Sequence, residues 1–190
     1  MFEIRLLGDP EFWLGEERLA PRMRPRCVSL LAYLIRHRER AHTRASVAAT
    51  LWPDEIEEDA RANLRRHLHL LATALPKLDA PLLVDANRML QWNSDAPVRV
   101  DFIEFERLAS SSETYEEALA LYRGELLRGH DDEWIFEARE AVHARVIDIL
   151  LELGSQAMRH GEFERAVAHA DRLLAGDEWR EEAIRLKMNA

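Results

Sequence analysis

The sequence predicts a mixed fold, in which an α+β domain over residues 1–95 is followed by an all-helical domain over residues 96–190. Two observations predict this division. Near the N-terminus apolar residues recur at every second position, as in half-buried strands, whereas beyond residue 96 they recur at every third and fourth position, as in amphipathic helices. A polar, proline-containing segment at residues 93–97 separates the two patterns and is the predicted boundary.

The charge balance changes at the same place. The 190 residues carry a formal net charge of −9, but residues 1–95 hold 14 basic and 14 acidic residues, so the whole acidic excess lies in the second half. An acidic protein is in general a poor partner for nucleic acid. A neutral first half, however, can place a locally basic surface on DNA while the acidic half stays away from it.

The single cysteine and the composition of the N-terminus indicate the cellular compartment in which the protein works. Cys27 is the single cysteine, so no intramolecular disulfide can form, and we expect a packed or idle thiol in the first helix. The N-terminus lacks the basic and then apolar order of a signal peptide. No apolar run approaches the roughly 20 residues of a membrane span. The sequence therefore predicts a protein of the reducing cytoplasm, without membrane contact.

The first domain is predicted to contain a small antiparallel sheet, three helices and a hairpin, in that order. Alternation of apolar residues marks strands within residues 2–6 and 12–19. Helices are expected from Pro25, from a cap at Thr43 to a stop at Pro53, and over residues 57–75. Two apolar runs around the polar turn 85–88 predict the hairpin.

The third helix is the strongest candidate for a functional element. Its leucines, Leu64, Leu68, Leu71 and Leu75, are spaced by four, three and four residues and therefore share one face, which we assign to the core. The opposite surface and its flanks then carry Arg, His and Asn side chains, while the acids are confined to the first turn. Such a helix fits the major groove, where arginine pairs with guanine and asparagine with adenine.

Two further arginines extend this surface. Arg88 at the hairpin tip is expected to reach the DNA backbone or minor groove, and Arg44 near the start of the second helix is expected to contact a phosphate. On an isolated helix, a charged outer face usually indicates only solvation. The order of sheet, three helices and hairpin favours DNA binding instead. The candidate DNA-binding residues are Asn63, Arg65, Arg66, His67, His69, Arg44 and Arg88.

The second half shows one convincing helical repeat. Small residues at Gly154, Ala157, Gly161, Ala166 and Ala170 have the spacing of a tetratricopeptide helix pair, in which two antiparallel helices pack closely. An apolar stripe runs almost to Ala190, whereas repeat arrays normally end in a polar cap. We therefore expect the chain to be a fragment of a longer protein.

The ordered motifs resemble those of a known family. Residues 1–93 resemble the OmpR/PhoB-type winged helix, and residues 97–190 resemble the bacterial transcriptional activator domain that follows it in SARP-type (antibiotic-regulatory) activators. The resemblance rests on the segments 4–8, 51–54, 60–65, 100–105, 121–127 and 132–134, with Arg139 a few residues on.

This resemblance implies an activator that binds direct-repeat promoter sites, usually as a homodimer, and recruits RNA polymerase. It also implies that the segment from Asn63 to His69 faces the groove. Residues 70–73 are apolar or uncharged where the family carries further basic residues, which predicts weaker and less salt-sensitive DNA binding.

Other functions have less support. His67 and His69 lie two residues apart on a helix and point about 200° from each other, so they cannot easily share a metal ion. The sequence contains no GxxxxGK[ST] and no GxSxG motif, so we expect no cofactor and no enzyme activity. One alternative stays open: a protein-interaction scaffold in which the winged helix has become a docking surface.

Overall fold

The computed structural model describes residues 1–176 and 179–190. Its contacts divide the chain into two compact units. The first contains Met1–Glu104 and Arg123–Glu137, and the second contains Phe105–Tyr122 and Ala138–Ala190. The predicted fold class, α+β followed by all-α, is confirmed. The first unit includes a segment well beyond residue 95, and a domain boundary at that residue stays a prediction.

The first unit opens with a four-stranded sheet of order β3-β2-β1-β7. Its strands are β1 (Phe2–Arg5), β2 (Glu11–Leu14), β3 (Glu17–Leu19) and β7 (Val98–Val100). β1 pairs with β2 in the antiparallel sense, as predicted, and with β7 in the parallel sense, with Phe2 opposite Val98. β7 was not predicted from the sequence, because a strand of three residues is too short to show a period.

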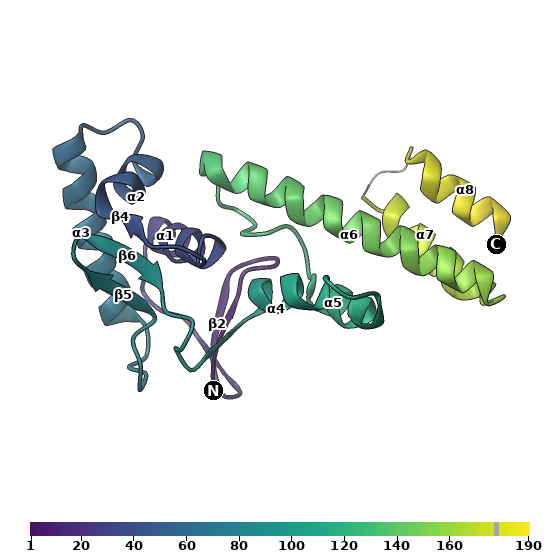
Figure 1. Ribbon diagram of the computed structural model, residues 1–190, viewed down its shortest axis with the longest axis horizontal. Coiled ribbons are helices and arrows are strands. Elements are labelled where there is room, and N and C mark those ends of the chain that lie inside the picture. The colour runs from purple at the N-terminus through teal and green to yellow at the C-terminus, as the bar shows by residue number, and fades with distance from the viewer. Residues whose placement is uncertain (177–178) are drawn as a thin grey trace. The chain divides into compact units, whose positions relative to one another are not determined.

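Three helices and a second sheet follow (Figure 1). The helices are α1 (Pro25–Arg36), α2 (Arg44–Leu51) and α3 (Glu57–Ala74), and the sheet has the order β4-β6-β5, with β4 (His42–Thr43), β5 (Leu83–Ala86) and β6 (Met89–Trp92). The Thr43 hydroxyl accepts a hydrogen bond from the Ser46 amide at 3.0 Å, which confirms the predicted cap of α2. The predicted hairpin is also present, because β5 and β6 pair antiparallel.

A buried carboxylate explains why residues 123–137 belong to the first unit. Asp101 is 3% exposed and accepts hydrogen bonds from the amides of Leu6 (2.7 Å) and Leu7 (3.1 Å) and from the guanidinium of Arg123 (2.9 Å). Burial raises the pKa of Asp101, and these three hydrogen bonds oppose that rise. In the same segment, the amide of Leu127 donates a hydrogen bond to the carbonyl oxygen of Leu6, which directly follows β1.

A second contact holds this segment on α1. The carboxylate of Asp132 pairs with Arg26 and accepts a hydrogen bond from the Ser29 hydroxyl at 2.6 Å. The Trp134 ring packs edge-on against Tyr33, with ring centres 5.4 Å apart. α6 (Glu133–Arg159) begins directly after Asp132, whose side chain is bound to α1.

The second unit is helical. It contains the end of α4 (Asp101–Leu108), a short 3-10 turn (Ser112–Thr114), α5 (Tyr115–Leu121), most of α6, α7 (Phe163–Leu174) and α8 (Glu181–Asn189). Ala157 of α6 and Ala166 and Ala170 of α7 are buried, which agrees with the close packing expected of a tetratricopeptide-like pair. None of the described helices combines the length and the apolar composition needed to cross a membrane.

Candidate nucleic-acid interface

α3 turns its leucines inward and its arginines outward. Leu64 is 1% exposed, Leu71 is also buried, and Leu68 is half-buried. Arg65, Arg66 and His69 are exposed, as their places on the opposite side of the helix predict. The helix ends at Ala74, so Leu75 packs into the core as its C-cap residue. The predicted orientation of α3 is therefore confirmed.

His67 requires a correction, because it does not face outward with the other candidates. It is 4% exposed and its ring lies 5.0 Å from that of Trp52. Its Nδ1 lies 2.7 Å from the carbonyl oxygen of Asn63, to which it donates. Burial lowers the pKa of His67, which favours the neutral ring in the fold. His67 belongs to the core, and we leave it out of the candidate interface.

Two polar side chains of α3 bind carboxylates near the N-terminus of the helix. The Asn63 amide donates to the carboxylate of Glu55 at 3.3 Å, and Arg61 pairs with Glu57 one turn earlier in the helix. Both acids lie at or just before the helix N-terminus, where the helix dipole favours negative charge. Asn63 is half-buried, and a base that binds the same amide nitrogen competes with Glu55 for it.

Four arginines surround an open hollow of about 550 Å³, which we call the arginine hollow. Three elements contribute to it: Arg44 from α2, Arg61 and Arg65 from α3, and Arg88 from the hairpin. Its remaining lining residues are Thr43, Ala45, Leu64, Asn87 and Met89. The fold thus brings together three predicted residues, Arg44, Arg65 and Arg88. Arg61 was not among the predicted residues, although its position four residues before Arg65 places both on one side of α3.

The hairpin geometry places Arg88 at this hollow. Asn87 and Arg88 have φ angles of 54° and 64°, the left-handed conformation that a tight two-residue turn between twisted antiparallel strands requires. The carbonyl oxygen of Arg88 accepts a hydrogen bond from the Arg44 amide at 3.0 Å, which fixes the turn to the start of α2. The turn and α2 therefore present their arginines side by side.

Carboxylates offset about half of the charge in the arginine hollow. Asp85 binds Arg44 through two hydrogen bonds, of which the one to Nε measures 3.1 Å, and Glu57 pairs with Arg61. In the part of the chain that the structure describes, Arg65, Arg66 and Arg88 have no carboxylate partner. A polyanion that approaches this face therefore meets two unopposed charges in the hollow and a third on α3.

The sequence matches the family of the bacterial transcriptional activator domain over residues 84–190, which is more than half of the chain. The chain belongs to this family. The match confirms the resemblance to SARP-type activators, and it begins within β5. The family is one of transcriptional regulators rather than of enzymes.

A solved structure shares the fold along almost the whole chain. Mycobacterium tuberculosis EmbR, in complex with a low-affinity phosphopeptide, superposes with a TM-score of 0.79 at 17% sequence identity. The match covers 98% of this chain and 53% of the EmbR chain, so this chain spans about half of that protein's length. Comparison with curated protein sequences gives no match.

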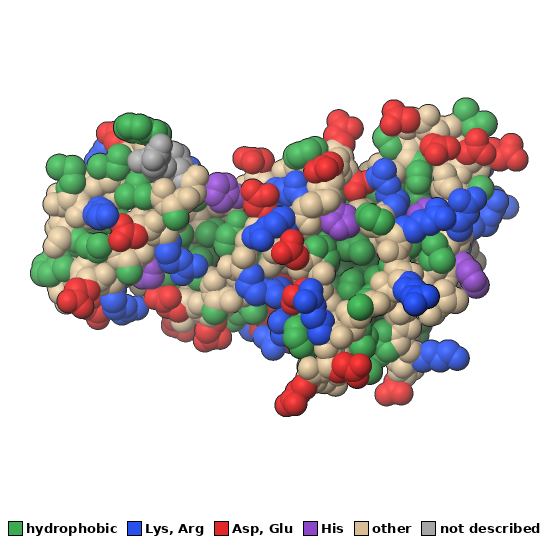
Figure 2. Space-filling model, turned by 180° about the vertical axis from the view of Figure 1, so that it is seen from behind, with side chains coloured by type: hydrophobic (Ala, Val, Ile, Leu, Met, Phe, Trp, Pro, Cys, Tyr) green, Lys and Arg blue, Asp and Glu red, His purple; other side chains and the backbone are tan. Residues whose placement is uncertain are grey.

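Five acidic side chains lie close together in the sequence where α2 leads into α3. This acidic loop, residues 53–59, comprises most of the connection and the first residues of α3, and contains Asp54, Glu55, Glu57, Glu58 and Asp59, with Ile56 at its centre. Ile56 is 69% exposed. Figure 2 shows red side chains over the region where α2 leads into α3, with blue side chains below them. The acidic loop is chemically unlike the arginine hollow.

Proposed function

We propose that this chain is a sequence-specific DNA-binding regulator of transcription, an activator that binds promoter repeats through α3 and recruits RNA polymerase. The observation that carries the proposal is the arrangement of Arg65 and Arg66 on α3 beside the arginine hollow. One face thus offers a helix for the major groove and a cluster of cations for the adjoining phosphates. Its membership of an activator family supports the same function.

The two arginines of α3 receive different roles. Arg65 lines the arginine hollow together with Arg44, Arg61 and Arg88, so we assign it to a phosphate. Arg66 and His69 are exposed on the outward side of α3, so we assign them to base edges. Asn63 joins them once Glu55 is displaced by DNA. This division predicts that Arg66 affects specificity, whereas Arg65 affects affinity for any sequence.

We assign the contact with RNA polymerase to the acidic loop. Its five carboxylates would repel a DNA backbone, whereas an exposed isoleucine among acids suits a basic protein surface with an apolar centre. On direct repeats, two copies of the chain would bind side by side, which is consistent with a homodimer on DNA. These roles place the protein in the cytoplasm, where the chromosome and the polymerase of a bacterium are found.

The test is a fluorescence anisotropy titration of the full-length protein against the promoter of its own operon at low salt. We expect specific binding, which Arg66→Ala weakens by about 1–3 kcal/mol, while binding to unrelated DNA changes much less. Arg65→Ala should weaken both by a similar factor. No specific binding by the full-length protein would refute the proposal.

The scaffold alternative is favoured by one observation, the acidic loop with its exposed Ile56. If the winged helix only docks protein, Ile56→Asp should abolish capture of a partner and Arg66→Ala should leave every activity unchanged. If the proposal is correct, Ile56→Asp should reduce transcription from the promoter in vitro without changing DNA affinity. The two variants together separate recruitment, DNA binding and docking.

A further inference from the structure

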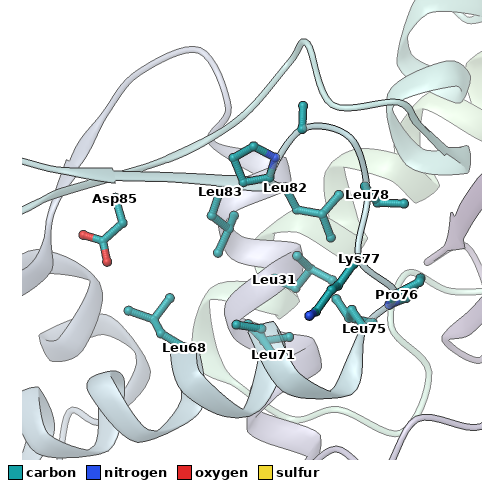
Figure 3. Close-up of a pocket in the computed structure, with 13 residues that line it drawn as sticks. Leu31, Leu68, Leu71, Leu75, Pro76, Lys77, Leu78, Leu82, Leu83 and Asp85 are labelled. Atoms are coloured by element: carbon teal, nitrogen blue, oxygen red, sulfur yellow. The ribbon is translucent and has the colours of Figure 1, made fainter.

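A second hollow lies on the core side of α3, and its lining is almost entirely apolar. It measures about 490 Å³, within the range of roughly 300–1,000 Å³ typical of small-molecule pockets. Figure 3 shows Leu68 and Leu71 of α3 and its C-cap residue Leu75 on one side, and Leu78 and Leu82 of the connection to β5 and Leu83 of β5 on the other. The other lining residues are Leu31, Ala72, Pro76, Lys77, Ala80, Pro81 and Asp85. We call this hollow the leucine pocket.

The leucine pocket is lined by apolar surface that the fold leaves accessible. Leu31, Leu71 and Leu75 are buried and form its floor, whereas Leu68, Leu78, Leu82 and Leu83 are half-buried around it. Leucine side chains in a well-packed core are covered on every side. Water at this surface is displaced favourably by an apolar ligand, at about 25 cal/mol for each Å² covered.

The charges at the pocket decide what kind of head group the ligand carries. Only two lining residues are charged, Lys77 and Asp85. The carboxylate of Asp85 already binds Arg44, so its charge is offset. Lys77 has no carboxylate partner among the described residues, and Figure 3 shows it between the two groups of leucines. An ammonium group beside apolar walls attracts an anion attached to an apolar body.

We propose that the leucine pocket is an effector site for a small amphipathic carboxylate, whose apolar body packs on the leucines and whose carboxylate pairs with Lys77. The effector role rests on the proposed function, whereas binding itself does not. An uncharged hydrophobic segment of a protein and a neutral apolar molecule are the competing occupants. Neither carries an anionic group that can pair with Lys77, so the charge of the ligand distinguishes them from the proposed carboxylate.

Two structural connections link the pocket to the DNA-binding surface. The same turns of α3 carry Leu68 and Leu71 toward the pocket and Arg65, Arg66 and His69 toward the proposed groove contact. β5 contributes Leu83 and Asp85 to the pocket, and Asp85 holds Arg44 of the arginine hollow. A ligand that shifts β5 or α3 therefore changes the affinity for DNA. By linkage, DNA must change the affinity for the ligand by the same factor.

The binding test uses decanoate as the probe and 1-decanol as its neutral counterpart, with the full chain labelled at its leucine methyl groups for NMR. We expect decanoate to shift the methyl signals of Leu68, Leu71 and Leu83 and to bind more tightly than decanol. Lys77→Gln should weaken decanoate binding roughly tenfold or more and leave decanol binding unchanged, whereas Lys77→Arg should retain it.

A pocket-filling variant tests the location. Ala72 lines the pocket and is exposed, so Ala72→Phe should fill it without disturbing the core and abolish decanoate binding. Thr73→Phe, on the next residue of α3, is the matched control and should bind decanoate normally. Binding that is equal for decanoate and decanol, or unaffected by Lys77→Gln and Ala72→Phe, would overturn the proposal, as would no binding at all.

The effector role is tested on DNA. Saturating decanoate should change the wild-type affinity for the operator several-fold, and operator DNA should change the decanoate affinity by an equal factor. Ala72→Phe should bind the operator without responding to decanoate. Decanoate binding with no change in operator affinity would refute the effector role alone. Failure of the wild type to bind any operator would refute the proposed function and leave the ligand site to be judged by NMR.

Discussion

Salt dependence offers a quantitative test of the arginine hollow. The perturbation is the double variant Arg65→Ala/Arg88→Ala, which removes the two arginines of the hollow that have no carboxylate partner among the described residues. Arg44 and Arg61 keep their partners Asp85 and Glu57. The hollow then changes from two net positive charges to none, while the leucines of α3 stay in the core.

The magnitude follows from counterion release. Each phosphate contact contributes about 0.9 to the slope of log Kobs against log salt concentration, so the double variant should lose about 1.8 from the slope. A fourfold rise in salt, from 50 to 200 mM, weakens binding by about 3.5-fold for each such contact. Over this range the wild type should therefore lose about 12-fold more affinity than the double variant.

The assay is fluorescence anisotropy on one operator duplex at four or more salt concentrations. Arg18→Ala is the control at another site, because Arg18 lies on β3 and its replacement removes one exposed positive charge, which is paired with Glu11. It should leave the slope unchanged. A double variant with the wild-type slope, or an equal loss of slope in Arg18→Ala, would show that the hollow does not contact phosphate.

Three further outcomes follow from the same contacts. Asp85→Asn frees Arg44 and should raise DNA affinity at low salt and steepen the salt slope by about 0.9, as measured by the same anisotropy titration. Because burial lowers the pKa of His67, the unfolded chain binds the proton more tightly, so the free energy of unfolding should fall as the pH drops below about 6.5. We would measure the free energy of unfolding by urea titration at pH 7.5 and 5.5. His67→Phe should reduce the fall in this free energy between the two pH values, whereas His69→Gln should not. An equal fall in both variants would contradict the assignment of His67 to the core. Leu64→Ala should lower the free energy of unfolding by about 2–5 kcal/mol in urea, since Leu64 is fully buried, and a loss below 1 kcal/mol would place it outside the core.

The sequence predicted the register of α3 because a helical period is a local property. Leucines spaced by three and four residues lie on one face of a helix, and this face packs against the core. The opposite face, which carries Arg65 and Arg66, must then point outward. The same reasoning explains the error at His67. Ala60, Leu64, His67 and Leu71 continue the four, three and four spacing, so the burial of His67 was present in the pattern. The outward assignment of His67 rested on the polarity of its side chain rather than on its position in the helix.

Other features were not accessible because they depend on residues far apart in the chain. The pairing of Phe2 with Val98 and the hydrogen bonds from Leu6 and Leu7 to Asp101 join segments more than 90 residues apart. The arginine hollow and the leucine pocket likewise depend on the path that the chain takes after α3. The sequence of this connection shows no apolar periodicity from which its path could be predicted. Single arginines were predictable as candidates, but their meeting around one hollow was not.

The central claim, that the outward face of α3 lies in the DNA groove, is tested most directly by cleavage of DNA from a tethered iron chelate. Cys27 is buried, so a new cysteine introduced by His69→Cys can be labelled selectively. We predict that the chelate at position 69 cleaves both operator strands within each repeat, at sites typical of the major groove, whereas a chelate at Glu17→Cys on β3 cleaves weakly. Cleavage from position 17 that equals or exceeds cleavage from position 69 would contradict the account.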